Sequence, residues 1–132
     1  MTNESGGKPA FDLGERTAVF GEAVIAFAKT IPVNDVTKPL NPQLVRAATS
    51  IGGNYVEADD ADSKKDFRFK IGLCRREARE TKHWLRMVVA AETQLRDAAR
   101  PLWQEAKELN LIFGAIRRKL KPRFASSFGL RH

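Results

Sequence analysis

Two side chains near the middle of the chain have the spacing of a metal-ligand pair. Glu80 and His83 form a Glu-x-x-His step, and a di-iron carboxylate site in a helical bundle needs two such steps on separate helices plus two further glutamates. The only other histidine is the C-terminal His132, so this site cannot be completed. We therefore expect His83 at the surface, and the sequence predicts no metal and no cofactor.

A catalytic nucleophile is equally hard to find. Cys74 is the single cysteine, and it lies between Ile71 and Ala78 on an apolar pattern that is typical of a small buried side chain. No serine or carboxylate has a spacing that would nominate it as a triad partner of His83. The sequence therefore predicts a protein without catalytic activity.

A stripe of basic side chains is the clearest candidate for binding chemistry. With about 100° per residue in a helix, five cations fall roughly 60 to 120° to one side of an apolar seam. Cations arranged in this way suit the phosphates of a nucleic acid. The stripe consists of Arg68, Arg75, Arg79, Lys82 and Arg86.

A second basic region lies at the C-terminal end. Residues 117–132 hold six Lys and Arg and no acid, with Phe124 and Phe128 among them. Cations with aromatic residues suit phosphates and unpaired bases, but cations at the end of a helix also complement its dipole, and both interpretations stay open. The candidate nucleic-acid-binding residues here are Arg117, Arg118, Lys119, Lys121 and Arg123.

The other flank of the helix that carries the stripe is apolar, with carboxylates in it. A lone bundle has no need to expose such a surface, so self-association is the expected use. The alternative is that these side chains cover the ends of the bundle or pack under the segment 32–40. The predicted interface residues are Phe69, Leu73, Glu77, Glu80, Trp84 and Met87.

Four segments must position these side chains, and each has apolar residues at alternating spacings of four and three. The expected helices are 13–31, a second from Asn41-Pro42 to about Asp60, a third from Ser63 to about Val88, and 97–120 with Pro101 in its first turn. Asp12 and Ser63 are expected as N-caps. Nothing predicts a strand.

Helices of similar length with short connections indicate an all-α protein, an antiparallel up-down-up-down four-helix bundle. We assign the bundle to residues 12–120. It is expected between a flexible N-terminal segment, 1–11, and a basic, flexible tail, 121–132.

Two adjacent glycines interrupt the second helix, where each costs about 1 kcal/mol relative to alanine. Close packing against a neighbouring helix would offset that cost, and the residues assigned to it are Ser50, Gly52, Gly53 and Asn54. The alternative, a phosphate cradle, lacks the Lys-Ser/Thr that follows a P-loop.

The charge of the chain is concentrated in its second half. The net charge is +7; residues 1–62 hold five basic and nine acidic side chains, and residues 63–132 hold eighteen and seven. This distribution suits a polyanionic partner. No stretch predicts a membrane span or a signal peptide, and a single cysteine agrees with a reducing compartment, so we expect no membrane partner and a cytoplasmic protein.

The stretch RAATSIGGNYVEADDADSKKDFRFKIGLCRREARETKHWL, residues 46–85, resembles the four helix bundle protein family first noticed as products of intervening sequences in 23S ribosomal RNA genes. That family shows an R-S-x-x-S-I-x-A-N-x-x-E-A block, then S-x-x-D-F, then E-A-x-E-T-x-Y-W-L. Gly53 stands where alanine is usual, and His83 where an aromatic residue is more common.

The resemblance implies a bundle that assembles into a ring-like homopentamer with no known catalysis. A distantly similar group, the accessory variability proteins of diversity-generating retroelements, binds RNA and a reverse transcriptase through a basic surface. The resemblance also implies that Arg46 or Asn54 of a neighbouring helix or subunit satisfies Glu77 and Glu80.

Two hypotheses follow. In the first, a homo-oligomer binds nucleic acid, RNA in preference to DNA, through its basic surface. In the second, the bundle is a protein-interaction scaffold whose basic face binds an acidic protein and has no nucleic-acid role.

Overall fold

Four long helices account for nearly all of the residues that the computed structural model describes, which are 12–121. They are α1 (Leu13–Ala28), α2 (Thr37–Asp59), α3 (Lys64–Ala91) and α4 (Arg96–Lys119), with a short 3-10 helix, η2 (Thr93–Leu95), before α4. No strand occurs among residues 12–121. The assignments of 1–11 and of the tail beyond Lys121 lie outside the described residues.

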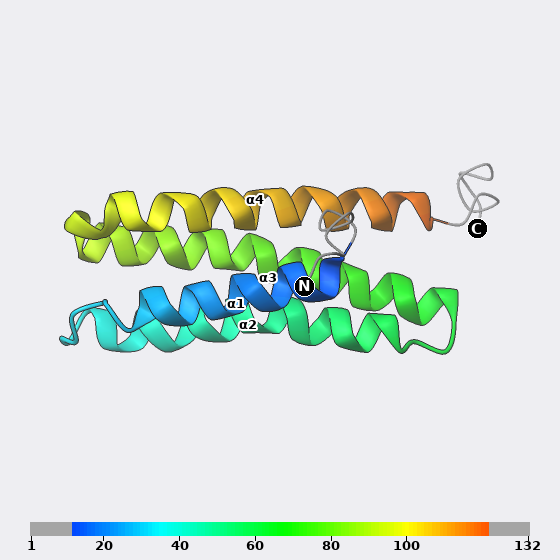
Figure 1. Ribbon diagram of the computed structural model, residues 1–132, viewed down its shortest axis with the longest axis horizontal. Helices are drawn as coiled ribbons and strands as arrows, with labels where there is room; N and C mark the ends of the chain where they lie inside the picture. The colour runs from blue at the N-terminus through cyan, green and yellow to red at the C-terminus, as the bar shows by residue number, and fades with distance from the viewer. Residues whose placement is uncertain (1–11, 122–132) are drawn as a thin grey trace, which may run out of the picture.

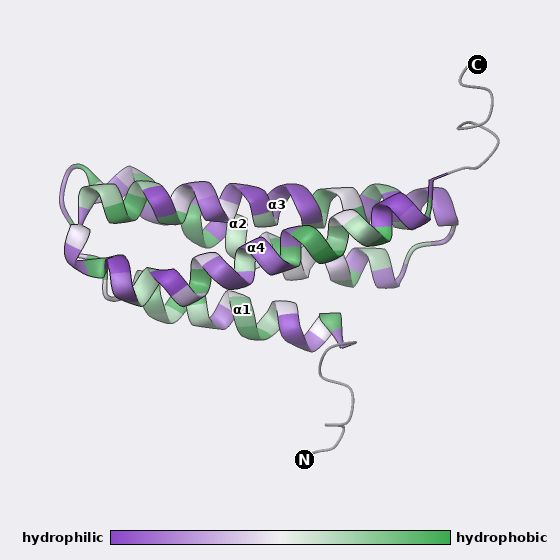
Figure 2. Cartoon of the chain, turned by 90° about the horizontal axis from the view of Figure 1, so that it is seen from above, coloured by the Kyte–Doolittle hydropathy of each residue, from purple (hydrophilic) through white to green (hydrophobic). Residues whose placement is uncertain are grey.

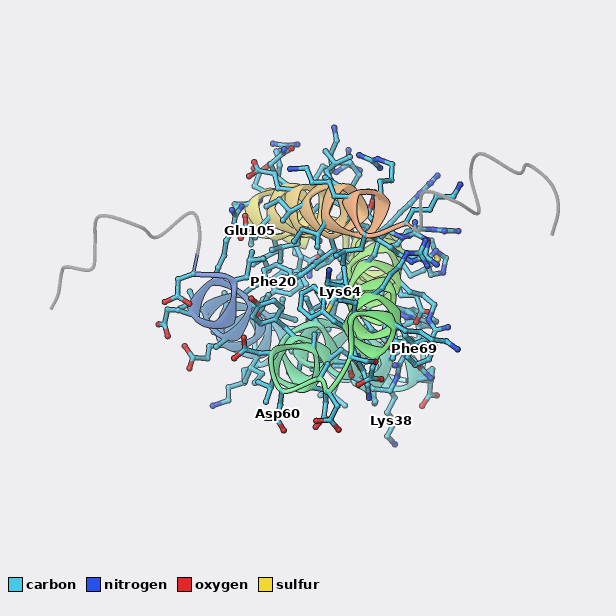
Figure 3. All side chains as sticks on the ribbon, turned by 90° about the vertical axis from the view of Figure 1, so that its right-hand side faces the viewer. Phe20, Lys38, Asp60, Lys64, Phe69 and Glu105 are labelled. Atoms are coloured by element: carbon cyan, nitrogen blue, oxygen red, sulfur yellow. The ribbon has the colours of Figure 1, made fainter. Side chains whose placement is uncertain are left out.

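Each helix runs antiparallel to the one before it (Figure 1). Seen from the end, the four helices stand at the corners of a square in the order α1, α2, α3, α4 (Figure 3). Consecutive helices pack closely. Among the four pairs of neighbouring helices, α1 and α4 have the weakest contact. The predicted all-α, antiparallel four-helix bundle is confirmed.

The apolar seams predicted from spacing form the core. In α1 the buried side chains include Phe20, Val24 and Phe27, and in α3 they include Ile71 and Leu85. A heptad seam faces inward along the whole helix because 3.5 residues nearly complete one turn. The core therefore runs the full length of the bundle. Within residues 12–121, no helix has the length and apolarity needed to cross a membrane.

Two of the predicted helix starts are made by side-chain caps. The carboxylate of Asp12 accepts a hydrogen bond from the Glu15 N–H at 3.0 Å, and the Ser63 hydroxyl accepts one from the Asp66 N–H at 3.0 Å. Each cap satisfies a backbone donor that has no partner inside its helix. The predicted N-caps at Asp12 and Ser63 are confirmed.

The predicted start of α2 is wrong. The helix begins at Thr37, because the Asn34 side-chain oxygen accepts from the N–H groups of Val36 and Thr37 and organises a turn upstream of the expected cap. Asn41 instead donates from its side-chain amide to the Ala28 carbonyl at 3.3 Å. Pro42 is tolerated inside the helix, where its missing N–H leaves the exposed Lys38 carbonyl to water.

The other helix limits differ from prediction by smaller amounts. The first helix ends at Ala28, and Ile31 is buried although it lies beyond the helix end. The fourth helix begins at Arg96, which places Pro101 in its second turn.

The two glycines of α2 have different surroundings. A Cβ built on Gly52 would lie 3.3 Å from the Thr17 hydroxyl oxygen and 3.6 Å from its backbone carbon, so α1 and α2 approach closely there. A Cβ on Gly53 would meet nothing within 4 Å, and the prediction of close packing at Gly53 is wrong because this residue faces outward. Asn54 donates to the Ser50 carbonyl of its own helix at 2.9 Å, so these two contact each other.

Candidate nucleic-acid interface

A groove of about 990 Å³ runs along the outer side of α3 and the last turns of α4. Nine of its lining residues are Lys or Arg and none is acidic. Figure 2 shows that the start of α3 and the end of α4, which supply them, lie at the same end of the bundle. The cations are Lys64, Lys65, Arg68, Arg75, Arg76, Arg79, Arg117, Lys119 and Lys121.

Two glycines, one on each helix, allow arginines to lie across the helix–helix contact. A Cβ on Gly72 of α3 would lie 2.9 Å from the Nε of Arg117, so the guanidinium of α4 rests directly on this glycine. The opposite arrangement occurs at Gly114 of α4, which faces Arg75 of α3. A Cβ built on Gly114 would lie 3.5 Å from the Arg75 Cδ. The side chain of Asn110 also donates to the Arg75 carbonyl at 3.0 Å, which fixes the register of α3 against α4.

The cations of the groove lack partners of opposite charge. Among residues 12–121 none of the nine makes an ion pair. The Nε atoms of Arg68 and Arg117 are buried and have no hydrogen-bond partner in the described part of the chain. A groove lined by nine cations and no acid is complementary to an anion with several acceptor oxygens, such as a phosphate.

Two carboxylates of α3, Glu77 and Glu80, are paired on another face of the bundle. Arg46 of α2 binds Glu77 at 3.4 Å and Glu80 at 3.2 Å, so the partner of both acids lies on a neighbouring helix of the same chain. Glu77 is only 9% exposed. Its prediction as part of an exposed flank is wrong, because it is buried beside Arg46 at the α2–α3 contact.

A second intramolecular cluster joins α1 to α4. The Nε of Arg16 donates to Glu105 at 2.7 Å, and its Nη2 atom donates to Glu108 at 3.0 Å. Hydrogen bonding to Glu105 raises the pKa of Arg16 above its ordinary value. Glu105 and Glu108 are thus paired with Arg16 of α1, and neither lines the groove.

The predicted basic stripe divides into two parts. Arg68, Arg75 and Arg79 line the groove, whereas Lys82 and Arg86 line a shallower hollow together with Trp103 of α4. The Nζ atoms of Lys82 and Lys107 lie 5.4 and 5.7 Å from the centre of the Trp103 ring, within cation–π range. Arg79 lines both hollows and connects them.

The predicted apolar flank divides in the same way. Phe69 and Leu73 line the groove with the cations, and Phe69 lies on the outer side of α3, away from α1 (Figure 3). Trp84 and Met87 are half-buried farther along the helix, and Trp84 packs partly on the core. The flank is therefore interrupted by the Arg46–Glu80 pair.

The side chains considered for catalysis lie apart from one another. Cys74 is fully buried, and its burial raises the pKa of its thiol to about 12. His83 is exposed, as expected, and meets the edge of Trp84 with ring centres 4.9 Å apart. No group of three or more His, Cys, Asp or Glu is placed to hold a metal ion among residues 12–121.

Sequence reasoning missed four contributors to this surface, namely Lys64, Lys65, Arg76 and Trp103. The first three lie on the same helix as the stripe. Lys64 has the same helical angle as Lys82 at about 100° per residue, whereas Lys65 and Arg76 lie farther round the helix. Trp103 lies on α4, and no spacing in the sequence connects it to Lys82. Of the predicted tail cations, Arg118 lies near Gly114, and Arg123 lies outside the described residues.

Comparison with known proteins identifies the family. The family model described as 23S rRNA-intervening sequence protein matches residues 12–115. The chain belongs to the 23S rRNA-intervening sequence protein family. This confirms the resemblance seen in residues 46–85. The family match ends before Arg117, Lys119 and Lys121, which form the α4 side of the groove.

A solved structure of a related protein supports the same fold. It is a protein of unknown function from the S23 ribosomal protein family of Bacteroides thetaiotaomicron. The two chains are 26% identical, with a TM-score of 0.69 over 79% of this chain and 96% of the other. No curated protein matches the chain.

Proposed function

We propose that this member of the 23S rRNA-intervening sequence protein family binds nucleic acid, RNA in preference to DNA, through the α3–α4 groove and without catalysis. The observation that carries the proposal is the set of nine cations that line one groove and make no ion pair within residues 12–121. The resemblance to the accessory proteins of retroelements, a group that binds RNA, supports RNA over DNA.

The chemistry of the groove predicts contacts to the backbone of the nucleic acid. Guanidinium groups bind phosphate oxygens in a planar, two-pronged geometry, and lysines add charge without direction. Phosphate contacts position a nucleic acid but do not report its bases. We therefore expect affinity with little sequence preference and a strong dependence on salt.

A salt titration tests this proposal. Nuclease-treated protein is titrated with a labelled structured RNA and with duplex DNA from low to physiological salt. We expect RNA binding to remain measurable at physiological salt. We also expect log K for binding to fall steeply and linearly with log salt concentration. Loss of all binding at physiological salt would overturn the proposal and favour a scaffold whose basic face binds an acidic protein.

Self-association is part of the proposal, because symmetry would repeat the groove and multiply its phosphate contacts. The half-exposed Trp84 and Met87 are the apolar members of the predicted interface that lie outside the groove. Light scattering of the purified protein should give a mass near five times the 14.8 kDa of one chain. A mass of 14.8 kDa at all concentrations would show that the protein binds as a monomer.

Replacing Gly72 with alanine should weaken RNA binding without destabilising the fold. The new methyl group would lie 2.9 Å from the Arg117 Nε, so the guanidinium must move away from the groove floor. We expect a loss of affinity of about tenfold or more, because one charge-assisted hydrogen bond contributes about 1.5 to 3 kcal/mol and every 1.4 kcal/mol is a tenfold change. Thermal unfolding should shift upward, since alanine stabilises a helix by about 1 kcal/mol relative to glycine.

The matched control is Gly53→Ala. This glycine also lies inside a helix, but nothing stands within 4 Å of its ideal Cβ. The control should gain about the same stability and bind RNA as the parent protein does. Equal affinity of the two variants would show that the position of Arg117 does not contribute to binding.

A further inference from the structure

The groove that carries the cations also has an apolar floor and rim. Gly72, Leu73 and Leu120 line it beside the arginines, and the ring of Phe69 is 60% exposed at the same place. Phe69, Leu73 and Leu120 together make an apolar patch among the cations, and an exposed apolar patch rimmed by polar residues is typical of a binding site. An aromatic ring among guanidinium groups is the combination that stacks an unpaired base and holds its phosphates.

The width of the groove distinguishes between the two forms of nucleic acid. Two neighbouring helices pack with their axes about 8 to 10 Å apart, and the groove lies between α3 and the end of α4. A double helix is wider than this spacing and keeps its bases stacked inside, so it can only lie across the rims. A single strand can lie along the groove over the α3–α4 contact and turn its unpaired bases toward the floor.

The cations are positioned to follow one strand for several nucleotides. They extend along α3 from Lys64 to Arg79, which is about 22 Å at 1.5 Å per residue. At the roughly 3.4 Å phosphate spacing of one stacked strand, this length accommodates about six phosphates, and fewer if the strand is extended. The unpartnered Nε atoms of Arg68 and Arg117 lie within this stretch.

We infer that the α3–α4 groove binds a single-stranded segment, with one base stacked on Phe69 and the adjoining phosphates on Arg68 and Arg117. This inference rests on the proposed function, since it names the form of nucleic acid that the same site takes. Duplex regions of a structured RNA would lie outside the groove, and an unpaired loop or end would enter it.

The test compares Phe69→Ala with the parent protein on two probes. One is an unstructured 12-nucleotide RNA, and the other is a blunt RNA duplex of matching length. Loss of one stacking contact should weaken binding of the single strand by about 5- to 150-fold and leave binding of the duplex within about twofold. The matched control is Leu111→Ala, an exposed apolar residue of α4 that is 61% exposed and does not line the groove.

The outcomes separate this inference from the proposed function. If neither probe binds the parent protein at physiological salt, the proposed function fails. If both probes bind and Phe69→Ala weakens both equally or neither, base stacking is overturned while nucleic-acid binding stands. If Phe69→Ala changes the mass in sedimentation, Phe69 is a contact between subunits and the inference is overturned.

Discussion

A variant with Arg68, Arg75 and Arg117 all replaced by glutamine should bind RNA at least about 100-fold more weakly than the parent at physiological salt. Each charged hydrogen bond to a phosphate contributes about 1.5 to 3 kcal/mol, and every 1.4 kcal/mol is a tenfold change in affinity. Arg117 lies on Gly72 and Arg75 lies beside Gly114 at the α3–α4 contact, and Arg68 lines the same groove. The variant therefore lacks three of the nine cations that line the groove.

The same variant should change the salt dependence of binding. For a single strand, log K falls with log salt by about 0.7 for each phosphate contact, so three lost contacts should reduce the slope by about 2. The fold should tolerate the changes, because the three arginines make no ion pair within residues 12–121 and their removal relieves repulsion among neighbouring cations. Filter binding at four salt concentrations and a thermal melt measure both effects.

The matched control replaces Lys29, Lys38 and Arg100 with glutamine. These cations are exposed and do not line the groove, yet the net charge falls by the same amount. The control should lose little affinity. An equal loss in the two triple variants would show that binding follows the overall charge and would contradict the assignment of the groove.

Replacing Phe113 with alanine should cost about 3 to 5 kcal/mol of the free energy of unfolding. This ring is 0% exposed in the middle of α4 and faces Tyr55 of α2 with ring centres 6.0 Å apart. This cost in free energy has two parts: the hydrophobic stabilisation that is lost with the ring, and the cavity that the ring leaves. A domain of this size has roughly 5 to 15 kcal/mol in total, so the midpoint of urea unfolding should fall markedly.

Two further variants serve as references for the effect of Phe113→Ala. Leu111→Ala, two residues away on the same helix but 61% exposed, should change stability by less than about 0.5 kcal/mol. Phe113→Leu should fall between the two, because leucine fills part of the space. A small effect of Phe113→Ala would contradict the packing of α4 against α2 through this ring.

The helices and their inward faces were predictable from sequence because their causes are local. A seam such as Phe20, Val24 and Phe27 turns one face of a helix inward whatever it packs against. The Asp12 and Ser63 caps act over three residues. The start of α2 was mispredicted because it depends on a turn at Asn34, which the helix pattern of α2 does not contain.

The candidate site was predictable only in part. The angle of Arg68, Arg75 and Arg79 on α3 follows from 100° per residue, so the basic stripe could be recognised. The same reasoning placed Glu77 on an exposed flank, and the helix cost of two adjacent glycines placed Gly53 at a close contact; both predictions are wrong. The angular position of a residue on its own helix does not reveal which side chain of a neighbouring helix covers it.

The sequence by itself determined four amphipathic helices, their order and a cationic face on the third. The tertiary structure decided that Arg117 rests on Gly72, that Arg75 faces Gly114, and that Phe69 shares a groove with these cations. These pairs of residues are about forty positions apart in the chain, and whether they meet depends on the axial register of α3 against α4. Register results from the packing of all the core side chains together, so no local spacing contains it.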